Sequence, residues 1–149
     1  MNWTWARFAE LGVDDLYDAL ALRSRVFVIE QNCNFQDADG VDRVSWHLLG
    51  RDDNGVLQAY LRLVDPGVKY AEPSMGRVIT APEARARGLG RVLVAEGLAR
   101  CAQVWPRHGV RISAQARLER FYAGFGFVGV GETYIEDDIP HLEMIRSGA

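Results

Sequence analysis

Residues 85–91, with the sequence RARGLGR, place three arginines and two glycines directly before a segment with helical periodicity. A helix N-terminus leaves main-chain N–H groups unpaired and carries partial positive charge, so it favours an anion. Gly88 and Gly90 lack a Cβ, which lets an anion approach the main chain closely. The guanidinium groups of Arg85, Arg87 and Arg91 can each hold a phosphate through two donors. This stretch is interpreted as a cradle for a pyrophosphate, with a solvated basic turn as the alternative.

Two common phosphate loops do not fit this stretch. A Walker loop requires GxxxxGK[ST], and no lysine follows these glycines. A Rossmann fingerprint requires GxGxxG, but Leu93 stands where the third glycine belongs. The remaining pattern is Arg85-x-x-Gly88-x-Gly90 between a strand and a helix.

The elements that must position this loop alternate along the chain. Asn54-Gly55 is a tight-turn signal between two apolar segments and predicts an antiparallel hairpin. Spacings of three and four residues predict the two longer helices, of which the second stops at Pro106. Strands are expected at 3–8, 44–50, 56–64, 75–80, 110–114, 127–134 and 141–146, and helices at 14–29, 91–105 and 116–125. This β-α-β-β-β-α-β-α-β-β order predicts an α/β (α+β) fold, a mixed sheet with helices on its faces.

Length and composition limit the class of protein. A chain of 149 residues with 48% hydrophobic residues suits one domain over 1–149. The net charge of -3 argues against a general nucleic-acid binder. The N-terminal sequence lacks a signal-peptide pattern, and no apolar stretch reaches membrane-spanning length, so a soluble cytoplasmic protein is expected. Cys33 and Cys101 have no metal-ligand spacing and are expected to be unpaired thiols.

An acidic loop at 37–42, DADGVD, has some features of a calcium loop. The EF-hand spacing fails, because its glycine comes too early and Leu48 occupies the twelfth position. No metal site is therefore expected. If the loop faces the functional site, its charge together with Glu136, Asp137 and Asp138 would favour a cationic substrate.

The loop and a second motif together resemble the GCN5-related N-acetyltransferases (GNAT). The pattern at 85–90 is similar to the R/Q-x-x-G-x-G/A motif of that family. Residues 115–127, QARLERFYAGFGF, loosely match N-x-x-A-x-x-L-Y-x-x-x-G-F with Tyr122, Gly126 and Phe127 in register. A narrower resemblance, to the ElaA-type branch, is carried by LRSRVFVIEQNCNFQDADGVD, HLLG, GRVI and EDDIPHLEM.

The resemblance implies a GNAT fold and a cofactor, acetyl-CoA or coenzyme A. The fold would be a mixed, mostly antiparallel sheet of about seven strands with about four helices on its faces. In that family the strands near residue 78 splay apart, leaving main-chain groups of Val78 and Thr80 free to pair with the pantetheine arm and to stabilise an oxyanion. The implied cofactor-binding residues are Val78, Ile79, Thr80, Arg85, Ala86, Arg87, Gly88, Leu89, Gly90, Arg91, Gln115 and Tyr122.

The family register implies a catalytic role for Tyr122. A phenol can protonate a departing thiolate in a dry site, so Tyr122 is the candidate general acid. The alternative is an aromatic side chain that packs beside Phe121 and Phe125. Gln115 stands where the family usually has Asn, and its amide is expected to bond the cofactor arm or to replace a helix N-cap.

A general base is harder to assign. Many relatives carry a carboxylate on the strand before the phosphate loop, but MGRVIT has none and Glu72 lies upstream. His141 and His47 are ranked as candidate bases, because imidazole suits proton transfer near neutral pH. His47 lies within an alternating strand and also fits a structural histidine. Glu143 and Glu30 rank lower, and a water relay is a further alternative.

Together these features predict an N-acetyltransferase that moves the acetyl group of acetyl-CoA to a primary amine of a small molecule or peptide. The alternative is a non-catalytic CoA-binding sensor or interaction domain. No nucleic-acid or membrane partner is expected, and a homodimer is left open.

Overall fold

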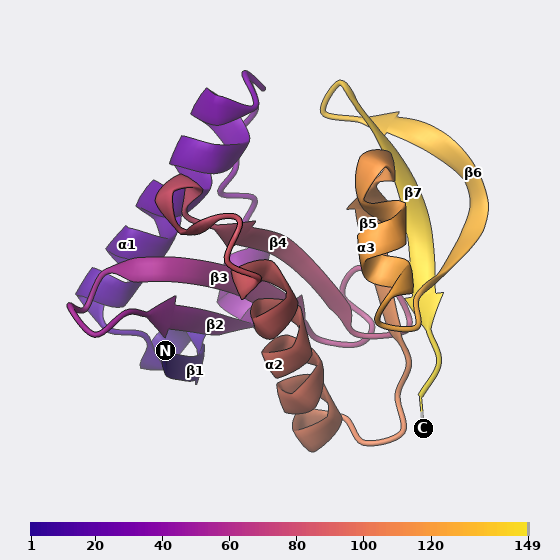
Figure 1. Cartoon of the computed structure of the whole chain (residues 1–149). Coiled ribbons are helices and arrows are strands. Elements are labelled where there is room, and N and C mark those ends of the chain that lie inside the picture. The colour runs from indigo at the N-terminus through magenta and orange to yellow at the C-terminus, as the bar shows by residue number, and fades with distance from the viewer. Residues whose placement is uncertain (149) are drawn as a thin grey trace.

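The computed structural model describes residues 1–148, and its strands form one seven-stranded sheet in the order β1-β2-β3-β4-β5-β7-β6 (Figure 1). Neighbouring strands pair antiparallel except β4 and β5, which are parallel. The expected mixed, mostly antiparallel sheet is confirmed. The strands are β1 (Asn2–Arg7), β2 (Ser45–Arg51), β3 (Leu57–Val64), β4 (Ser74–Thr80), β5 (Val110–Gln115), β6 (Val128–Glu136) and β7 (Ile139–Arg146).

The helices occur in the predicted order between these strands. Within residues 1–148 they comprise three α-helices, one π-helix and four short 3₁₀ turns, where about four helices were expected. None of the described helices combines the length and hydropathy needed to span a bilayer. The longer helices are α1 (Val13–Arg23), the π-helix η2 (Ser24–Glu30) that continues it, α2 (Leu89–Val104) and α3 (Glu119–Ala123).

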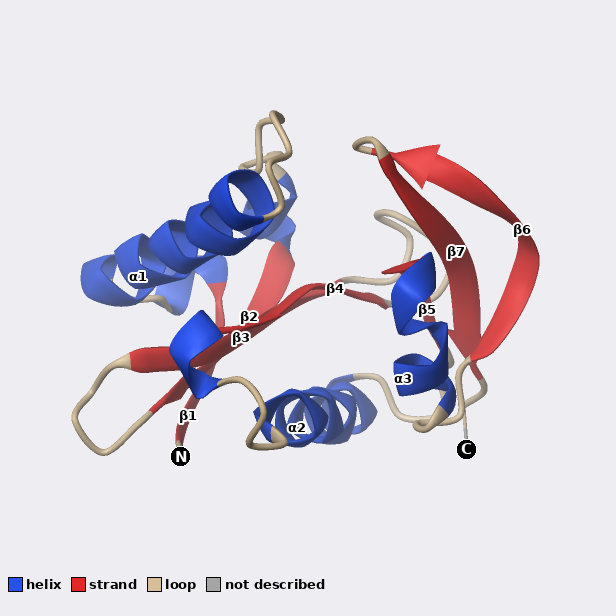
Figure 2. Ribbon diagram, turned by 45° about the horizontal axis from the view of Figure 1, so that its top comes forward, coloured by secondary structure: helices blue, strands red, loops and turns tan. Residues whose placement is uncertain are grey.

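Alternation along β3 supplies apolar side chains to both faces of the sheet. Leu61 and Leu63 belong to a core that includes the buried face of α2, whereas Tyr60 belongs to a second core with α1. Figure 2 shows α1 and α2 on opposite faces. A Cβ added to Gly97 in α2 would lie 2.7 Å from the Cδ2 atom of Leu61, so a glycine permits the close approach of α2 to the sheet.

The sheet is divided where β4 meets β5. Their pairing consists of a single register, Ser74 with Arg111, and the two strands then diverge. Strands β1–β4 lie on one side of this division and the antiparallel set β5-β7-β6 lies on the other (Figures 1 and 2). The splayed strands that the family resemblance implied are confirmed, and the divergence leaves one edge of β4 open along its C-terminal half.

Candidate active site

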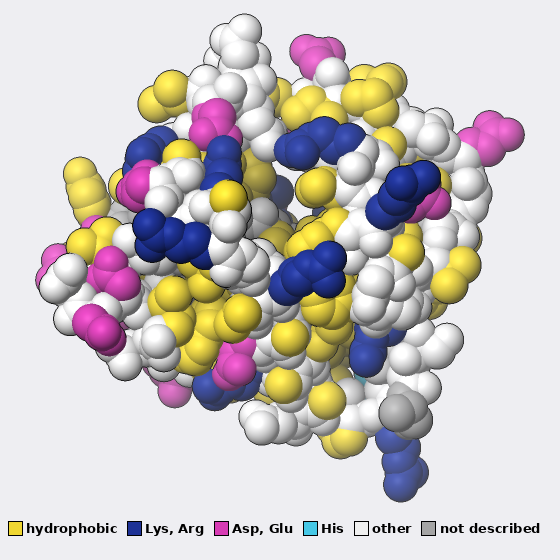
Figure 3. Space-filling view, in the orientation of Figure 1, with side chains coloured by type: hydrophobic (Ala, Val, Ile, Leu, Met, Phe, Trp, Pro, Cys, Tyr) yellow, Lys and Arg dark blue, Asp and Glu magenta, His cyan; other side chains and the backbone are white. Residues whose placement is uncertain are grey.

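A cavity of about 120 Å³ lies where β4 and β5 separate. Its walls come from β4, β5, the end of the π-helix with the loop that follows, and the hairpin of β6 and β7. The space-filling view shows a hollow between the two halves of the molecule, with apolar and basic side chains around it (Figure 3). Two of the sequence-predicted catalytic residues, Tyr122 and His141, line this same cavity.

The open edge of β4 forms one wall and contains a β-bulge. The register with β3 shifts between Tyr60 and Arg62, and Arg77 adopts a left-handed conformation with φ 52°. A bulge re-aims the strand and leaves a main-chain unit without a ladder partner. Val78 lines the cavity directly after this bulge, whereas Ile79 is buried in the α1 core. The structure thus places Val78, Ile79 and Thr80 on the strand edge where an extended ligand can pair.

The loop before α2 presents unpaired N–H groups, as the sequence predicts. Ala86 and Gly88 have left-handed φ values of 66° and 73°, and Gly88 is the N-cap residue of α2. The first intrahelical hydrogen bond runs from the N–H of Val92 to the carbonyl oxygen of Gly88, over 3.3 Å. The N–H groups of residues 89–91 therefore have no partner within the helix, which makes this end suitable for an anion.

Two exposed ion pairs attach this loop to the π-helix. Arg85 Nη2 lies 2.7 Å from Glu30 Oε1, and Arg25 Nη2 lies 2.7 Å from Glu83 Oε2. Arg87 and Arg91 are exposed and form no ion pair with the described residues. Glu30 is thus paired with the phosphate loop and is not among the residues that line the cavity.

Tyr122 is buried in α3, with its ring packed edge-on against Phe121 and Phe127. Its hydroxyl has no hydrogen-bond partner among residues 1–148, and the side chain lines the cavity. Burial raises the pKa of Tyr122 to about 12, against a smaller opposing effect of Arg117. The hydroxyl therefore keeps its proton at neutral pH and is placed to donate it into the cavity.

His141 lies on β7 on the opposite wall of the cavity. Its Nδ1 lies 2.7 Å from the carbonyl oxygen of Ile139, which can only accept, so Nδ1 donates and Nε2 keeps its lone pair in the neutral ring. Nε2 lies 3.5 Å from Glu136 Oε2. The Ser113 hydroxyl also donates to Glu136 Oε2, over 3.4 Å, and bonds the hydroxyl of Tyr134. His141 is thus a proton acceptor beside a carboxylate.

The other base candidates are occupied elsewhere. His47 is 1% exposed and bonds the Tyr60 hydroxyl (2.7 Å) and the Asp42 carbonyl oxygen (2.9 Å) through its two ring nitrogens. Burial lowers the pKa of His47, outweighing the hydrogen bond to Asp42, which raises it. His47 does not contribute to the cavity wall, whereas His141 does. Glu143 and Glu72 both pair with Arg111, over 3.1 Å.

The acidic loop is neutralised by arginines from three elements. Asp37 binds Arg23 and Arg77, each over 2.7 Å. Asp42 binds Arg23 over 2.7 Å, and Asp39 binds Arg62 over 2.8 Å. The loop is therefore a structural ion-pair cluster, and its three aspartates do not supply the free negative field that a cationic substrate would need.

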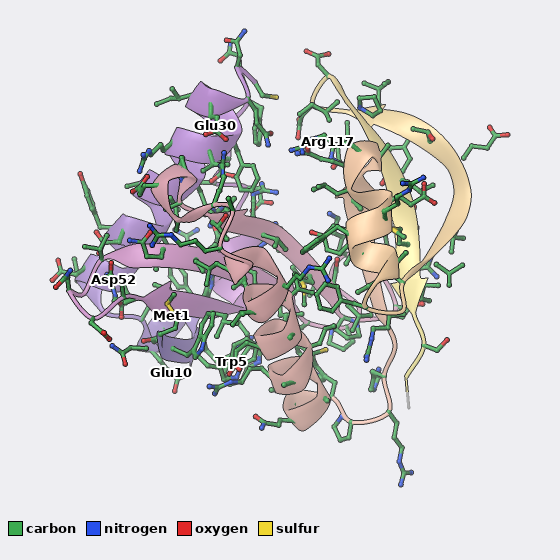
Figure 4. All side chains as sticks on the ribbon, in the orientation of Figure 1. Met1, Trp5, Glu10, Glu30, Asp52 and Arg117 are labelled. Atoms are coloured by element: carbon green, nitrogen blue, oxygen red, sulfur yellow. The ribbon has the colours of Figure 1, made fainter. Side chains whose placement is uncertain are left out.

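Two of the hydrogen bonds that join the two halves of the molecule lie at the cavity. Gln115 Nε2 on β5 donates to Gln31 Oε1, over 3.3 Å, and Cys33 Sγ donates to the carbonyl oxygen of Asp137, over 3.0 Å. Arg117, which donates to Gln115 Oε1 over 3.2 Å, and Glu30 mark opposite sides of the gap in Figure 4. The Gln115 amide thus lies at the cavity wall between β5 and the segment that follows the π-helix.

Sequence reasoning missed Ser113, Tyr134 and Lys69 and named Glu136 only as part of an acidic segment, and two signals in the sequence could have revealed how these residues are placed. The register of the β6–β7 hairpin pairs Tyr134 with His141 and brings in Glu136 and Ser113. A hairpin register drawn through Asp137 and Asp138 predicts the pairing of Tyr134 with His141. Lys69 also lines the cavity, and its signal is compositional, since it is the only lysine among the 17 basic residues.

Comparisons with known proteins agree with this geometry. A family model for the acetyltransferase (GNAT) domain matches residues 47–147. A UPF0039 protein from Synechocystis sp. is 46% identical over 97% of this chain and 94% of its own length. Protein ElaA from Escherichia coli is 40% identical over 98% of this chain and 96% of its own length.

Solved structures show the same similarity. An acyl-CoA N-acyltransferase from Pseudomonas aeruginosa superposes with a TM-score of 0.93 at 42% identity, over 99% of this chain and 100% of that one. The crystal structure of Escherichia coli ElaA superposes with a TM-score of 0.91 at 39% identity, over 98% of this chain and 99% of that one.

Proposed function

The chain belongs to the GNAT acetyltransferase family, and on this basis we propose that it transfers the acetyl group of acetyl-CoA to a primary amine of a small molecule or peptide. The observation that carries the proposal is the placement of Tyr122 and His141 on one cavity beside the open edge of β4. A proton donor, a proton acceptor and an unpaired strand edge are the parts that such a transfer requires.

The residues present fit coenzyme A. The unpaired N–H groups at the start of α2, with Arg85, Arg87 and Arg91, suit a pyrophosphate. The edge of β4 from Val78 to Thr80 suits an extended arm that bears amides, and Gln115 lies across from that edge on β5. Bound acetyl-CoA would supply a thioester carbon that a neutral amine can attack.

Proton transfer can be assigned to the chain's own side chains. His141 Nε2 accepts the proton of the incoming ammonium, and the Glu136 carboxylate stabilises the resulting imidazolium. Once the N–C bond to acetyl-CoA has formed, Tyr122 would donate its proton to the sulfur as the C–S bond breaks. The ammonium loses two protons in all. One passes to His141 and then to solvent, and the second, released from nitrogen as the amide forms, replaces through solvent the proton that Tyr122 gave to the thiol.

Two measurements test the proposal. Calorimetry with coenzyme A is expected to show binding, and thiol release from acetyl-CoA across a panel of small amines and peptides is expected to show turnover. Binding without turnover on any amine would favour the alternative, a CoA-binding sensor or interaction domain. Absence of binding would contradict both readings.

A further inference from the structure

Lys69 differs from every other basic residue in the chain. Of the 17 lysine and arginine residues it is the only lysine, and it lines the cavity from the loop between β3 and β4. Its ammonium has no carboxylate within 4.0 Å among residues 1–148. The other cations of the cavity wall, Arg62 and Arg77, both pair with Asp39. Lys69 is thus the cavity cation whose charge is left unmatched in the described chain.

The surroundings of Lys69 favour an anion next to it. Although the residue is exposed overall, desolvation lowers the pKa of its ammonium. The charges of Arg62 and Arg77 act in the same direction, whereas Glu136 and Asp39 raise that pKa. The lysine Nζ lies 5.7 Å from the centre of the Tyr70 ring. An anionic group bound here would offset the repulsion from the two arginines.

The same cavity also contains the opposite charge. Glu136 interacts with Lys69 at a distance too long for an ion pair, and it lies 3.5 Å from His141 Nε2. A purely anionic ligand would be repelled by Glu136 and Asp137, whereas a purely cationic ligand would be repelled by Lys69. A ligand with both charges can place its anion beside Lys69 and its cation beside the carboxylates.

We propose that the acceptor is a zwitterionic amine of the amino-acid class, with its carboxylate on Lys69 and its amino group between Glu136 and His141. This inference rests on the proposed acetyl transfer and makes N-acetyl amino acids the products. The acidic loop does not oppose it, because Asp37, Asp39 and Asp42 are held by arginines. Lys69 is thereby the residue that selects a carboxylate-bearing acceptor.

The kinetic test compares free amino acids with their own carboxamides, which keep the amine and side chain but lack the negative charge. The free acids are expected to have kcat/KM values about 10- to 100-fold higher, the range of a charged hydrogen bond. Lys69→Met should abolish this preference, and Lys69→Arg should restore part of it. Arg107→Met removes one exposed charge outside the cavity and should leave the preference unchanged.

A binding measurement tests the same inference without turnover. Incorporation of ¹³C,¹⁵N-lysine gives one side-chain NMR signal, because Lys69 is the only lysine. Free amino acids are expected to shift that signal and raise the pKa of the Lys69 ammonium, whereas the carboxamides are not.

A signal that responds to neither set, or equal turnover of acids and carboxamides, would overturn the inference. Amine turnover with no such preference would leave the acetyltransferase proposal intact, whereas a Lys69 response without any turnover would count against acetyl transfer alone.

Discussion

Arg85 of the phosphate loop and Glu30 at the end of the π-helix form an exposed ion pair with an N···O distance of 2.7 Å. The carboxylate occupies the guanidinium that the proposed pyrophosphate needs, and it would also repel that phosphate. Glu30→Gln is therefore expected to strengthen coenzyme A binding about two- to fivefold at low salt, in keeping with the small energies of exposed pairs. Calorimetry at low and high salt measures the effect, which should shrink as screening increases.

Glu83→Gln is the matched control for that variant, since Glu83 pairs with Arg25 at the same distance and lies in the short turn directly before the loop. It removes an equal charge without releasing Arg85. An equal gain in affinity from both variants would show a general charge effect and would remove the specific role of Glu30.

Removal of Arg85 itself should weaken coenzyme A. Arg85→Ala deletes a charged hydrogen-bond donor to phosphate and is expected to raise Kd about 10-fold. This value is at the lower end of the range for hydrogen bonds to charged groups, because Arg85 is exposed. Arg25→Ala, on the adjoining π-helix, serves as the comparison and should change Kd less. Unchanged affinity in Arg85→Ala would contradict the placement of the pyrophosphate.

Tyr122→Phe should lower kcat while coenzyme A affinity stays close to that of the wild type. The buried hydroxyl, with its pKa raised to about 12, remains protonated at working pH and serves as the donor to sulfur. Loss of a general acid typically costs about 10²- to 10⁴-fold in rate. Tyr17→Phe changes an exposed tyrosine of α1 and should leave kcat unaltered. A wild-type kcat in Tyr122→Phe would mean that the ring only packs α3.

The two histidines are expected to respond differently to the same change. His141→Gln should reduce kcat/KM about 100-fold and flatten its rise with pH, because the proton acceptor of the cavity is lost. His47→Gln should keep the pH profile of kcat/KM but lower the free energy of unfolding by about 1–3 kcal/mol, because the Tyr60 hydroxyl and Asp42 carbonyl lose a shared partner. Paired pH–rate profiles and urea titrations distinguish these outcomes, and a flattened profile in His47→Gln would reverse the assignment.

Stability at low pH should depend on Asp39. Burial alone would raise the pKa of Asp39, but hydrogen bonds and charge from Arg62 outweigh it and hold the pKa at about 2. A lowered folded-state pKa stabilises the protein above about pH 4, and this contribution is lost as the pH falls through 2. Asp39→Asn should therefore cost about 1 kcal/mol at pH 7, after solvent screening, and almost nothing near pH 2. Urea unfolding at several pH values measures this, with the exposed Asp53→Asn as a control that should match the wild type.

Local patterns in the sequence predicted the order of elements and the phosphate loop, because glycines, a turn signal and helical spacing act over a few residues. Such local patterns could not predict that the acidic loop pairs with arginines. Its partners Arg23, Arg62 and Arg77 come from α1, β3 and β4, so the cluster forms only when the sheet assembles. Arg23 illustrates the difficulty, since its place within the helix predicted at 14–29 gave no sign of the two aspartates that pair with it.

The base could not be chosen from the sequence for a related reason. Both His47 and His141 lie on strands, and their difference depends on which wall each strand forms. The open edge of β4 and the hairpin of β6 and β7 place His141 on the cavity, whereas pairing with β3 buries His47 against Tyr60. Only the assembled sheet shows which of the two histidines lies on the cavity.

The composition of the chain leaves amine-reactive reagents with very few targets. Lys69 carries the only side-chain amine, so acylating dyes and succinimide-activated surfaces find one other amine, the α-amino group of Met1. Immobilisation through lysine would place the solid support at the mouth of the cavity, whereas a probe attached there would report on its contents. Coupling through Lys69 is therefore a direct way to place a fluorophore beside the site and a poor way to fix the protein for binding measurements.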